Sequence, residues 1–422
     1  MDVLPQGGIA VFLGGVEAGG SVDDLQPFAQ DPDLYYLVGT QEAGSALVLA
    51  PDGVDVDGQL VHEVLFVPPR NPAMEIWLGR RFGPERAGGA LGVQVALSYQ
   101  RFGDVMAPIL ADPKRRVFLM PFPEAVPPST TLSQQIGVLS QAAAERGGTF
   151  DLTTLPEVLR GLREIKSDEE ISLIRKAVDI TAAAHREAMS AMEPGWAEYE
   201  IEALIEYTFH RMGSERPGFP SIVGSGENTV MLHYDTNRRV TRDGDLVVMD
   251  IGASYRGYTA DITRTVPVNG RFTPDQRAIY DIVLAAQEAG IAAARAGASF
   301  GAPGQAASDV LVKGLAKLGL VKGEKDLAGL RRFFPHGTSH YLGLQVHDVG
   351  SYRALKPGAV ITVEPGIYIA PAEDIDPRWW NIGVRIEDDV LVTQEGPVVL
   401  SGGAPKTPEE IEAIMAGGGP EK

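Results

Sequence analysis

Cysteine is missing altogether from the 422 residues of this chain. Its absence excludes disulfide cross-links, thiolate nucleophiles and cysteine-based zinc or iron–sulfur sites. Positive charge is also scarce, because 37 Lys and Arg face 56 Asp and Glu, which gives a formal net charge of −19. Nucleic acids and anionic membrane surfaces require clustered Lys and Arg, so we expect neither as the main partner.

Long apolar runs are absent as well, since none approaches the roughly 18 residues of a membrane helix. The first ten residues, MDVLPQGGIA, lack the basic stretch and apolar segment of a secretory signal. We therefore expect a soluble, cytoplasmic protein. A hydrophobic content of 44% supplies sizeable cores, and the length suits two domains of about 100–200 residues each.

Short apolar runs and helical stretches alternate in the first part of the chain. This alternation predicts a small α/β domain over residues 1–165. The strand-like runs are residues 9–13, 35–38, 46–49, 64–67 and 117–120, and the helical stretches lie near residues 75–81 and 134–146.

A capping box, Ser167-Asp168-Glu169-Glu170, opens a long helical pattern and marks the start of a second domain, residues 166–422. A second N-cap at Thr407, followed by Pro408, predicts a last short helix. Between them, helices alternate with strand pairs, which predicts an α+β domain around an antiparallel sheet. The predicted helices are residues 167–192, 197–212, 274–296 and 304–319, and the strand pairs are 246–266, 359–369 and 384–393.

The strand pair 246–266, LVVMDIGASYRGYTADITRTV, contains two aspartates in an otherwise apolar setting. With a turn centred between Tyr255 and Arg256, Asp250 and Asp261 would face each other directly. Two like charges at about 5 Å destabilise a sheet, and burial raises the cost further. A shared proton, a nearby arginine or a bound cation would each compensate.

Further polar residues interrupt other apolar stretches. Three of the seven histidines, His336, His340 and His347, fall in HGTSHYLGLQVHD, while Glu364 follows an apolar strand in VITVEPGIYI. In IGVRIEDDVLV, Arg385 and Glu387 are two residues apart and point to one face of a strand. Of the other four histidines, His62, His185 and His210 are expected to be structural or exposed.

Four carboxylates and one imidazole together form the ligand set of two divalent ions that share bridging carboxylates. Four negative charges would balance two dications, which removes the electrostatic objection to the two aspartates. Such a pair lowers the pKa of a bridging water and polarises a carbonyl, so amide or ester hydrolysis is the chemistry expected. Residue counts alone leave a Ser-His-Asp triad open as an alternative.

The residues Asp250, Asp261, His340, Glu364 and Glu387, in this order and with these flanks, resemble the dinuclear metallopeptidases of the pita-bread fold. The resemblance is strongest to the bacterial Xaa-Pro aminopeptidases (aminopeptidase P). It extends over most of the chain, through SIVGSGEN, LHYDTN, DGDLVVMDIGASYRGYTADITRTVPVNG, HGTSHYLGLQVHDVG, TVEPGIYIAP, GVRIEDDVLV and the N-terminal EIWLGRR. The fold implied is α+β: a pita-bread catalytic domain with a smaller α/β creatinase-like N-terminal domain.

The resemblance also implies a role for each metal ligand. Asp250 would hold one ion, Asp261 and Glu387 would bridge both, and His340 and Glu364 would complete the second. Glu364 would also pass the proton from the bridging water to the leaving nitrogen. The usual bacterial metal pair is two Mn²⁺ ions, with Co²⁺ or Zn²⁺ as alternatives.

The remaining roles concern the substrate, a peptide with proline at its second position. His233 and His347 would hydrogen-bond the substrate carbonyl or the tetrahedral intermediate, and His336 would line the pocket. Arg385 would fix a metal-bound carboxylate. Relatives form dimers or tetramers, so we expect a homo-oligomer in which Trp77 reaches a neighbouring active site, unless Trp77 is a buried helix aromatic.

Two other functions fit the same residues. A prolidase shares all five ligands but cleaves only Xaa-Pro dipeptides. A metal-free binding or scaffold protein would keep the fold without the chemistry, although the complete ligand set in this sequence argues against it.

Overall fold

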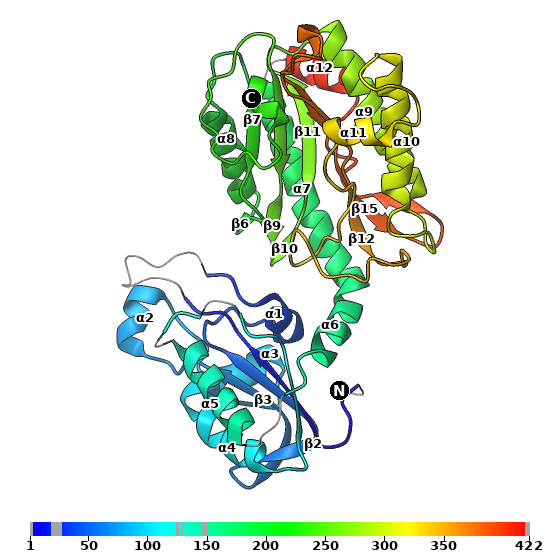
Figure 1. Ribbon diagram of the computed structural model, residues 1–422. Coiled ribbons are helices and arrows are strands. Elements are labelled where there is room, and N and C mark those ends of the chain that lie inside the picture. Colours follow the sequence, from blue (N-terminus) through cyan, green and yellow to red (C-terminus); the bar gives the residue numbers. More distant parts are fainter. Residues whose placement is uncertain (1–2, 18–27, 124–125, 129, 146–149, 418–422) are drawn as a thin grey trace. The chain divides into compact units, whose positions relative to one another are not determined.

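The computed structural model describes residues 3–17, 28–123, 126–128, 130–145 and 150–417. The chain divides into two compact units, Met1–Arg160 (unit 1) and Gly161–Lys422 (unit 2), each visible in Figure 1. The division falls within helix α6 (Thr154–Glu164), a few residues before the boundary that the sequence predicts.

A mixed five-stranded sheet of order β4-β3-β2-β1-β5 forms the centre of unit 1. β1 pairs with β5 and β3 with β4 in parallel, while β2 is antiparallel to both of its neighbours. A tight turn joins β2 to β3 because Asp57 and Gly58 both adopt positive φ, as a type I′ turn requires. The strands are β1 (Gly8–Leu13), β2 (Ala46–Val56), β3 (Gln59–Val67), β4 (Val95–Ser98) and β5 (Arg116–Leu119).

Helices cover this sheet, and apolar clusters lie on both of its faces. The helices are α1 (Pro32–Val38), α2 (Pro72–Leu78), α3 (Pro84–Leu91), the 3₁₀ turn η2 (Tyr99–Arg101), α4 (Phe102–Ala111) and α5 (Thr131–Glu145). The expectation of a strand at residues 35–38 is wrong, because this run belongs to α1. The Asp31 carboxylate caps that helix by accepting from Asp33 N and Leu34 N, and Pro32 begins it.

The helices of unit 2 confirm the predicted pattern of starts. Ser167 caps α7 and Thr407 caps α12, each in a complete capping box. α7 packs against α8, and α9 packs against α10; Figure 1 shows α8 and α10 flanking the strands. The helical elements are α7 (Asp168–Ala191), α8 (Glu198–Arg211), η3 (Gly226–Val230), α9 (Pro274–Ala293), α10 (Ala302–Lys317), α11 (Leu327–Phe333), η4 (Pro377–Trp379) and α12 (Pro408–Ala416).

Four short sheets lie between these helices, of order β10-β9-β6, β11-β8-β7, β12-β15-β16 and β13-β14, and all their pairs are antiparallel. The first, second and fourth of these sheets share one large apolar cluster with the helices, whereas β12 and β15 belong to two smaller clusters. The strands are β6 (Arg216–Pro217), β7 (Ile222–Ser225), β8 (Leu246–Ile251), β9 (Ala253–Tyr255), β10 (Tyr258–Thr259), β11 (Ile262–Pro267), β12 (Val360–Val363), β13 (Gly366–Ile369), β14 (Ile382–Arg385), β15 (Asp388–Val392) and β16 (Pro397–Val399).

The predicted register of the aspartate hairpin is wrong by two residues. Asp250 pairs with Thr263, whereas Asp261 lies just before β11. The turn centres on Arg256 and Gly257, which both have positive φ, instead of between Tyr255 and Arg256. A two-residue slip preserves the face on which each side chain lies, so the two carboxylates are diagonal neighbours on the same face.

None of the helices described combines the length and the apolar character that a membrane crossing requires.

Candidate active site

Strand ends from three sheets of unit 2 bring the predicted ligands together. Asp250 lies in β8, Asp261 precedes β11, and His340 lies in the loop that pairs with β12. Glu364 separates β12 from β13, and Glu387 separates β14 from β15. Val363 pairs with Asp388 on one side of the two glutamates, and Gly366 pairs with Arg385 on the other, in the same antiparallel register. Glu364 and Glu387 therefore lie opposite each other where the strands separate.

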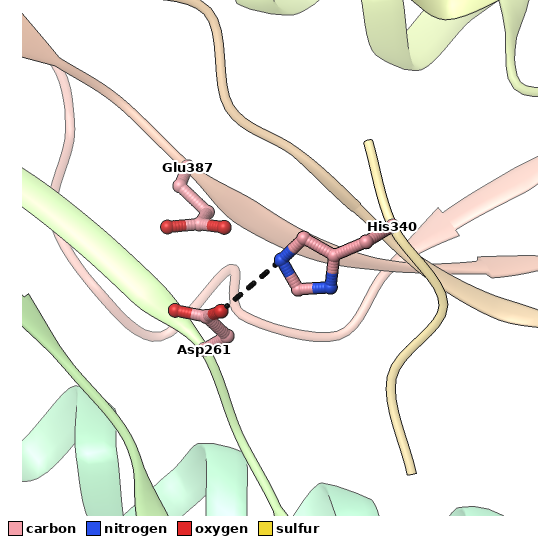
Figure 2. Close-up of side chains that lie close together, drawn as sticks. All are labelled: Asp261, His340 and Glu387. Atoms are coloured by element: carbon pink, nitrogen blue, oxygen red, sulfur yellow. Dashed lines mark ion pairs between the residues drawn. The ribbon is translucent and has the colours of Figure 1, made fainter. Parts of the chain in front are cut away.

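The centre of the site is a cluster of Asp261, His340 and Glu387, each with one ligand atom within 4.8 Å of the others. Figure 2 shows the three side chains pointing toward one another. His340 Nε2 lies 3.4 Å from Asp261 Oδ2 and 3.4 Å from Glu364 Oε1. Asp261 is 5% and Glu387 2% exposed, so these carboxylates have little access to bulk water.

Arg385 connects the remaining aspartate to this cluster. Its Nη2 donates to Asp250 Oδ2 at 2.6 Å, its Nη1 to Tyr368 Oη at 3.0 Å and its Nε to Thr263 Oγ1 at 3.1 Å. Thr263 Oγ1 in turn donates to Glu387 Oε2 at 2.7 Å. One buried guanidinium therefore orients two of the candidate ligands, Asp250 directly and Glu387 through a hydroxyl.

Burial and mutual repulsion raise the pKa values of the clustered carboxyls. For Asp261 the cause is burial, followed by the charges of Asp250 and Asp389, and its pKa lies well above its ordinary value. Burial, followed by the charges of Asp261 and Glu364, likewise raises the pKa of Glu387 well above its ordinary value. Burial raises the pKa of Glu364 to about 7. A nearby dication would reverse these shifts because it stabilises the ionised forms.

The residues present fit divalent metal ions. Asp250 Oδ1 and Asp261 Oδ1 are buried and have no hydrogen-bond partner among the residues that the structure describes. Buried oxygens without partners are costly unless something else satisfies them. Carboxylate oxygens and imidazole nitrogens are suitable ligands for hard and borderline dications.

A cavity of about 410 Å³ is lined by His340 and by two further candidate ligands, Asp250 and Glu364. Its polar wall includes His233, His336, His347 and Ser339, and its other lining residues include Leu232 and Tyr352. A cavity of about 450 Å³ in unit 1 is similar in size, so volume alone does not distinguish the site. The difference is chemical, because only the unit 2 cavity borders the clustered imidazoles and carboxylates.

The predicted substrate histidines occupy different places in this cavity. His336 Nδ1 lies 3.5 Å from Glu364 Oε2, and its Nε2 shares a hydrogen bond with Tyr368 Oη at 2.8 Å. Burial, followed by the charge of Arg385, lowers the pKa of His336 to about 4. His347 packs edge-on against His340 with ring centroids 4.4 Å apart, while His233 lines the cavity from an exposed position.

Three residues of the site were not predicted from the sequence. Thr263 and Tyr368 link Arg385 to its neighbours, and hydroxyl residues within apolar strands give no distinctive signal. Asp389 is fully buried and accepts from Asp261 N at 3.1 Å. The sequence does contain an indication of Asp389, because three consecutive acidic residues in the apolar stretch IEDDVLV would each need a partner that compensates the burial of their charge.

One further carboxylate organises the segment that carries His233. Glu198 is fully buried and accepts five hydrogen bonds, from Ser225 N and Oγ, Asn228 Nδ2, Tyr234 Oη and Arg239 N. These donors lie on both sides of His233 in the chain. The loop therefore has a defined course despite its lack of strands.

Two of the other histidines make structural hydrogen bonds to backbone carbonyls, as expected. His185 is fully buried, and its Nε2 bonds Ile262 O at 3.0 Å. His62 Nδ1 bonds Pro51 O at 2.9 Å in unit 1.

Comparison with known proteins gives matches over nearly the whole chain. A model described as metallopeptidase family M24 matches residues 172–394, and one described as the aminopeptidase P N-terminal domain matches residues 1–118. Xaa-Pro aminopeptidase of Escherichia coli (strain K12) is 39% identical, with 98% of this chain and 95% of the relative covered. Xaa-Pro aminopeptidase 3 of Homo sapiens is 34% identical, with 92% and 77% covered. A structure of E. coli aminopeptidase P with the inhibitor Pro-Leu has a TM-score of 0.88 at 38% identity, with 98% and 95% covered.

Proposed function

Because the chain belongs to metallopeptidase family M24, we propose that it is a metal-dependent Xaa-Pro aminopeptidase. It would release the N-terminal residue from peptides whose second residue is proline. The predicted pita-bread fold and the creatinase-like N-terminal domain are confirmed by the same matches. The observation that carries the proposal is the convergence of the predicted acidic and imidazole ligands in a chain that resembles Xaa-Pro aminopeptidases throughout.

We assign the five predicted ligands to two divalent ions. Asp250 would hold one ion, Asp261 and Glu387 would bridge both, and His340 and Glu364 would complete the second. The tight grouping of Asp261, His340 and Glu387 supports this assignment. Mn²⁺ is the proposed metal, since oxygen-rich sites with one imidazole suit it. When bound, such a pair lowers the pKa of a shared water and polarises the peptide carbonyl.

The chain's own residues would orient the substrate and move protons. Glu364 borders the cavity, so its carboxyl would take a proton from the attacking water and deliver it to the leaving nitrogen of proline. His347 and His233 would donate N–H groups to the carbonyl oxygen as negative charge develops there. His336 would line the pocket, and Arg385 would keep the Asp250 carboxylate in place.

The preference for proline also has a chemical basis. A bond that precedes proline is a tertiary amide without an N–H group, so a pocket that requires no amide donor suits it. The wall formed by Leu232 and Tyr352 offers apolar surface for a pyrrolidine ring. We propose that these residues contribute to the fit of proline.

A peptide panel tests the function and separates it from a prolidase. The purified chain is assayed with an Ala-Pro-Ala tripeptide and an Ala-Pro dipeptide, in the presence of Mn²⁺, Co²⁺ or Zn²⁺ in turn. An aminopeptidase cleaves the tripeptide efficiently, whereas a prolidase prefers the dipeptide. Cleavage of neither peptide with any of the metals would contradict the proposal and favour a binding protein.

We also propose that the chain forms a homo-oligomer in the cytoplasm. Trp77 is 72% and Ile76 82% exposed on α2, so the alternative that Trp77 is a buried helix aromatic is wrong. Adjacent exposed apolar side chains of this size favour contact with a partner. Light scattering on the chain and on Trp77→Ser tests this proposal, which requires a mass above 45.1 kDa for the unaltered chain.

A further inference from the structure

The loop that carries His340 and His347 has little regular structure of its own, apart from isolated bridges at Tyr341. We propose that Arg163, Glu164 and Lys166 are positioning residues that hold this loop in its working conformation. The inference rests on the proposed function, because it assigns these charges a role through the two imidazoles.

The first anchor is the carboxylate of Asp348, the residue directly after His347. Arg163 Nη2 donates to Asp348 Oδ1, and Lys166 Nζ donates to Asp348 Oδ2 at 3.0 Å. Arg163 Nη2 also donates to Gln345 Oε1 at 3.1 Å. The side chains of all three charged residues are only 1–2% exposed, so solvent screens this group little.

The second anchor is Glu164, whose side chain is 1% exposed. Its carboxylate accepts from Tyr341 Oη at 3.0 Å, from Ser351 Oγ at 2.7 Å and from Lys356 Nζ at 2.8 Å. Tyr341 directly follows His340 and is fully buried. Glu164 therefore fixes the loop at its beginning and again beyond His347.

The two anchors are joined within the loop itself. Asp348 N donates to Tyr341 O at 2.8 Å, which fixes the distance between the backbones next to the two histidines. A side chain at Gly350 would place its Cβ only 2.1 Å from the Tyr341 ring, so the chain can pass there only as glycine. Arg163, Glu164 and Lys166 thus contact the residues that directly follow His340 and His347, whose rings pack edge-on.

Buried charges are a costly way to fix a loop, which suggests a requirement for precision. An apolar contact of similar volume would stabilise the fold at least as well. Charged partners with fixed hydrogen-bond geometry specify one arrangement and penalise others. These residues precede the segment 172–394 that the M24 model matches, and they belong to unit 2 by their contacts.

The test uses the full-length protein with Arg163→Met and Glu164→Gln. Hydrogen exchange of residues 341–351 should become roughly tenfold faster or more in each variant. Displaced imidazoles should lower kcat by about 10- to 100-fold, with KM changed much less. Arg163→Lys, which keeps the charge, should recover part of both losses.

The control is Leu311→Ala, a fully buried position of α10 in the large apolar cluster. It should destabilise unit 2 to a similar degree while leaving the exchange of residues 341–351 and kcat unchanged. If Leu311→Ala lowers kcat as much as Arg163→Met does, or if the anchor variants keep normal loop exchange, the inference is overturned. Should Arg163→Met fail to fold, Arg163→Lys and Glu164→Gln give the same comparison. Loop exchange needs no substrate, so a failed proposed function remains distinguishable from a failed anchor.

Discussion

Replacement of Thr263 by the nearly isosteric valine tests what orients the ligands of the candidate metal site. Its buried hydroxyl donates to Glu387 Oε2 at 2.7 Å and accepts from Arg385 Nε at 3.1 Å. Thr263→Val preserves the branched shape and removes both hydrogen bonds. The candidate bridging carboxylate then loses its link to the guanidinium.

The Thr263→Val substitution deprives two buried groups of a hydrogen-bond partner. Arg385 Nε and Glu387 Oε2 would each remain buried without a partner, at a cost of about 1–3 kcal/mol for each group. Loss of such an outer partner typically lowers metal affinity or activity by about 10- to 100-fold. We therefore expect Thr263→Val to lower both the free energy of unfolding and the affinity for Mn²⁺.

Thr265 provides the matched control two residues along the same strand. Its hydroxyl is equally buried, donates to Arg385 O at 3.0 Å and accepts from Arg385 N at 3.1 Å. Thr265→Val should destabilise the fold comparably but leave Mn²⁺ affinity within about threefold. Calorimetric titration with Mn²⁺ and urea unfolding measure the two quantities. Equal Mn²⁺ affinity in the two variants would refute the reasoning.

Three further predictions concern catalysis, stability and pH. Glu364→Gln should lower kcat by roughly 10²- to 10⁴-fold without unfolding the protein, and a near-normal kcat would exclude it from proton transfer. Arg264→Met removes one of the two cations that pair with buried Asp388 and the donors to four backbone carbonyls, so it should destabilise the fold by about 3–5 kcal/mol. Arg271→Met, at an exposed pair, should cost at most about 1 kcal/mol in urea unfolding. Burial lowers the pKa of His185 from 6.5 to about 3, so between these pH values the unfolded state binds a proton that the folded state does not, and the free energy of unfolding falls as the pH drops below about 6.5. His185→Gln should therefore flatten the pH dependence of the free energy of unfolding in urea between pH 7.5 and 5 by about 1 kcal/mol per pH unit. An unchanged slope would contradict this assignment.

Local chemistry explains which parts of the fold the sequence could predict. Ser167 and Thr407 begin helices because their caps involve residues only three positions away. The register of the aspartate hairpin could not be predicted, because Arg256, a residue with no special preference for positive φ, occupies the turn beside Gly257. The composition of residues 35–38 is typical of a strand, but the N-cap at Asp31 stabilises a helix that includes them.

The candidate site shows a similar division. Its carboxylates and histidines stand out in the sequence because charged groups in apolar strands need compensation. The link through Thr263 could not be predicted, because it connects separate sheets and depends on how those sheets pack, and the link through Tyr368 depends on the register of β13 and β14. The contacts of Arg163 and Glu164 to the histidine loop join residues more than 170 positions apart, so no local pattern reveals them.

The central claim is that two divalent ions balance the clustered carboxylates, and metal removal tests it most directly. The chain is stripped with a chelator, its metal content is measured by elemental analysis, and hydrolysis of Ala-Pro-Ala is followed as Mn²⁺ is restored. The account predicts that turnover vanishes with the metal and returns as about two ions per chain bind. Undiminished hydrolysis by the metal-free protein would contradict it.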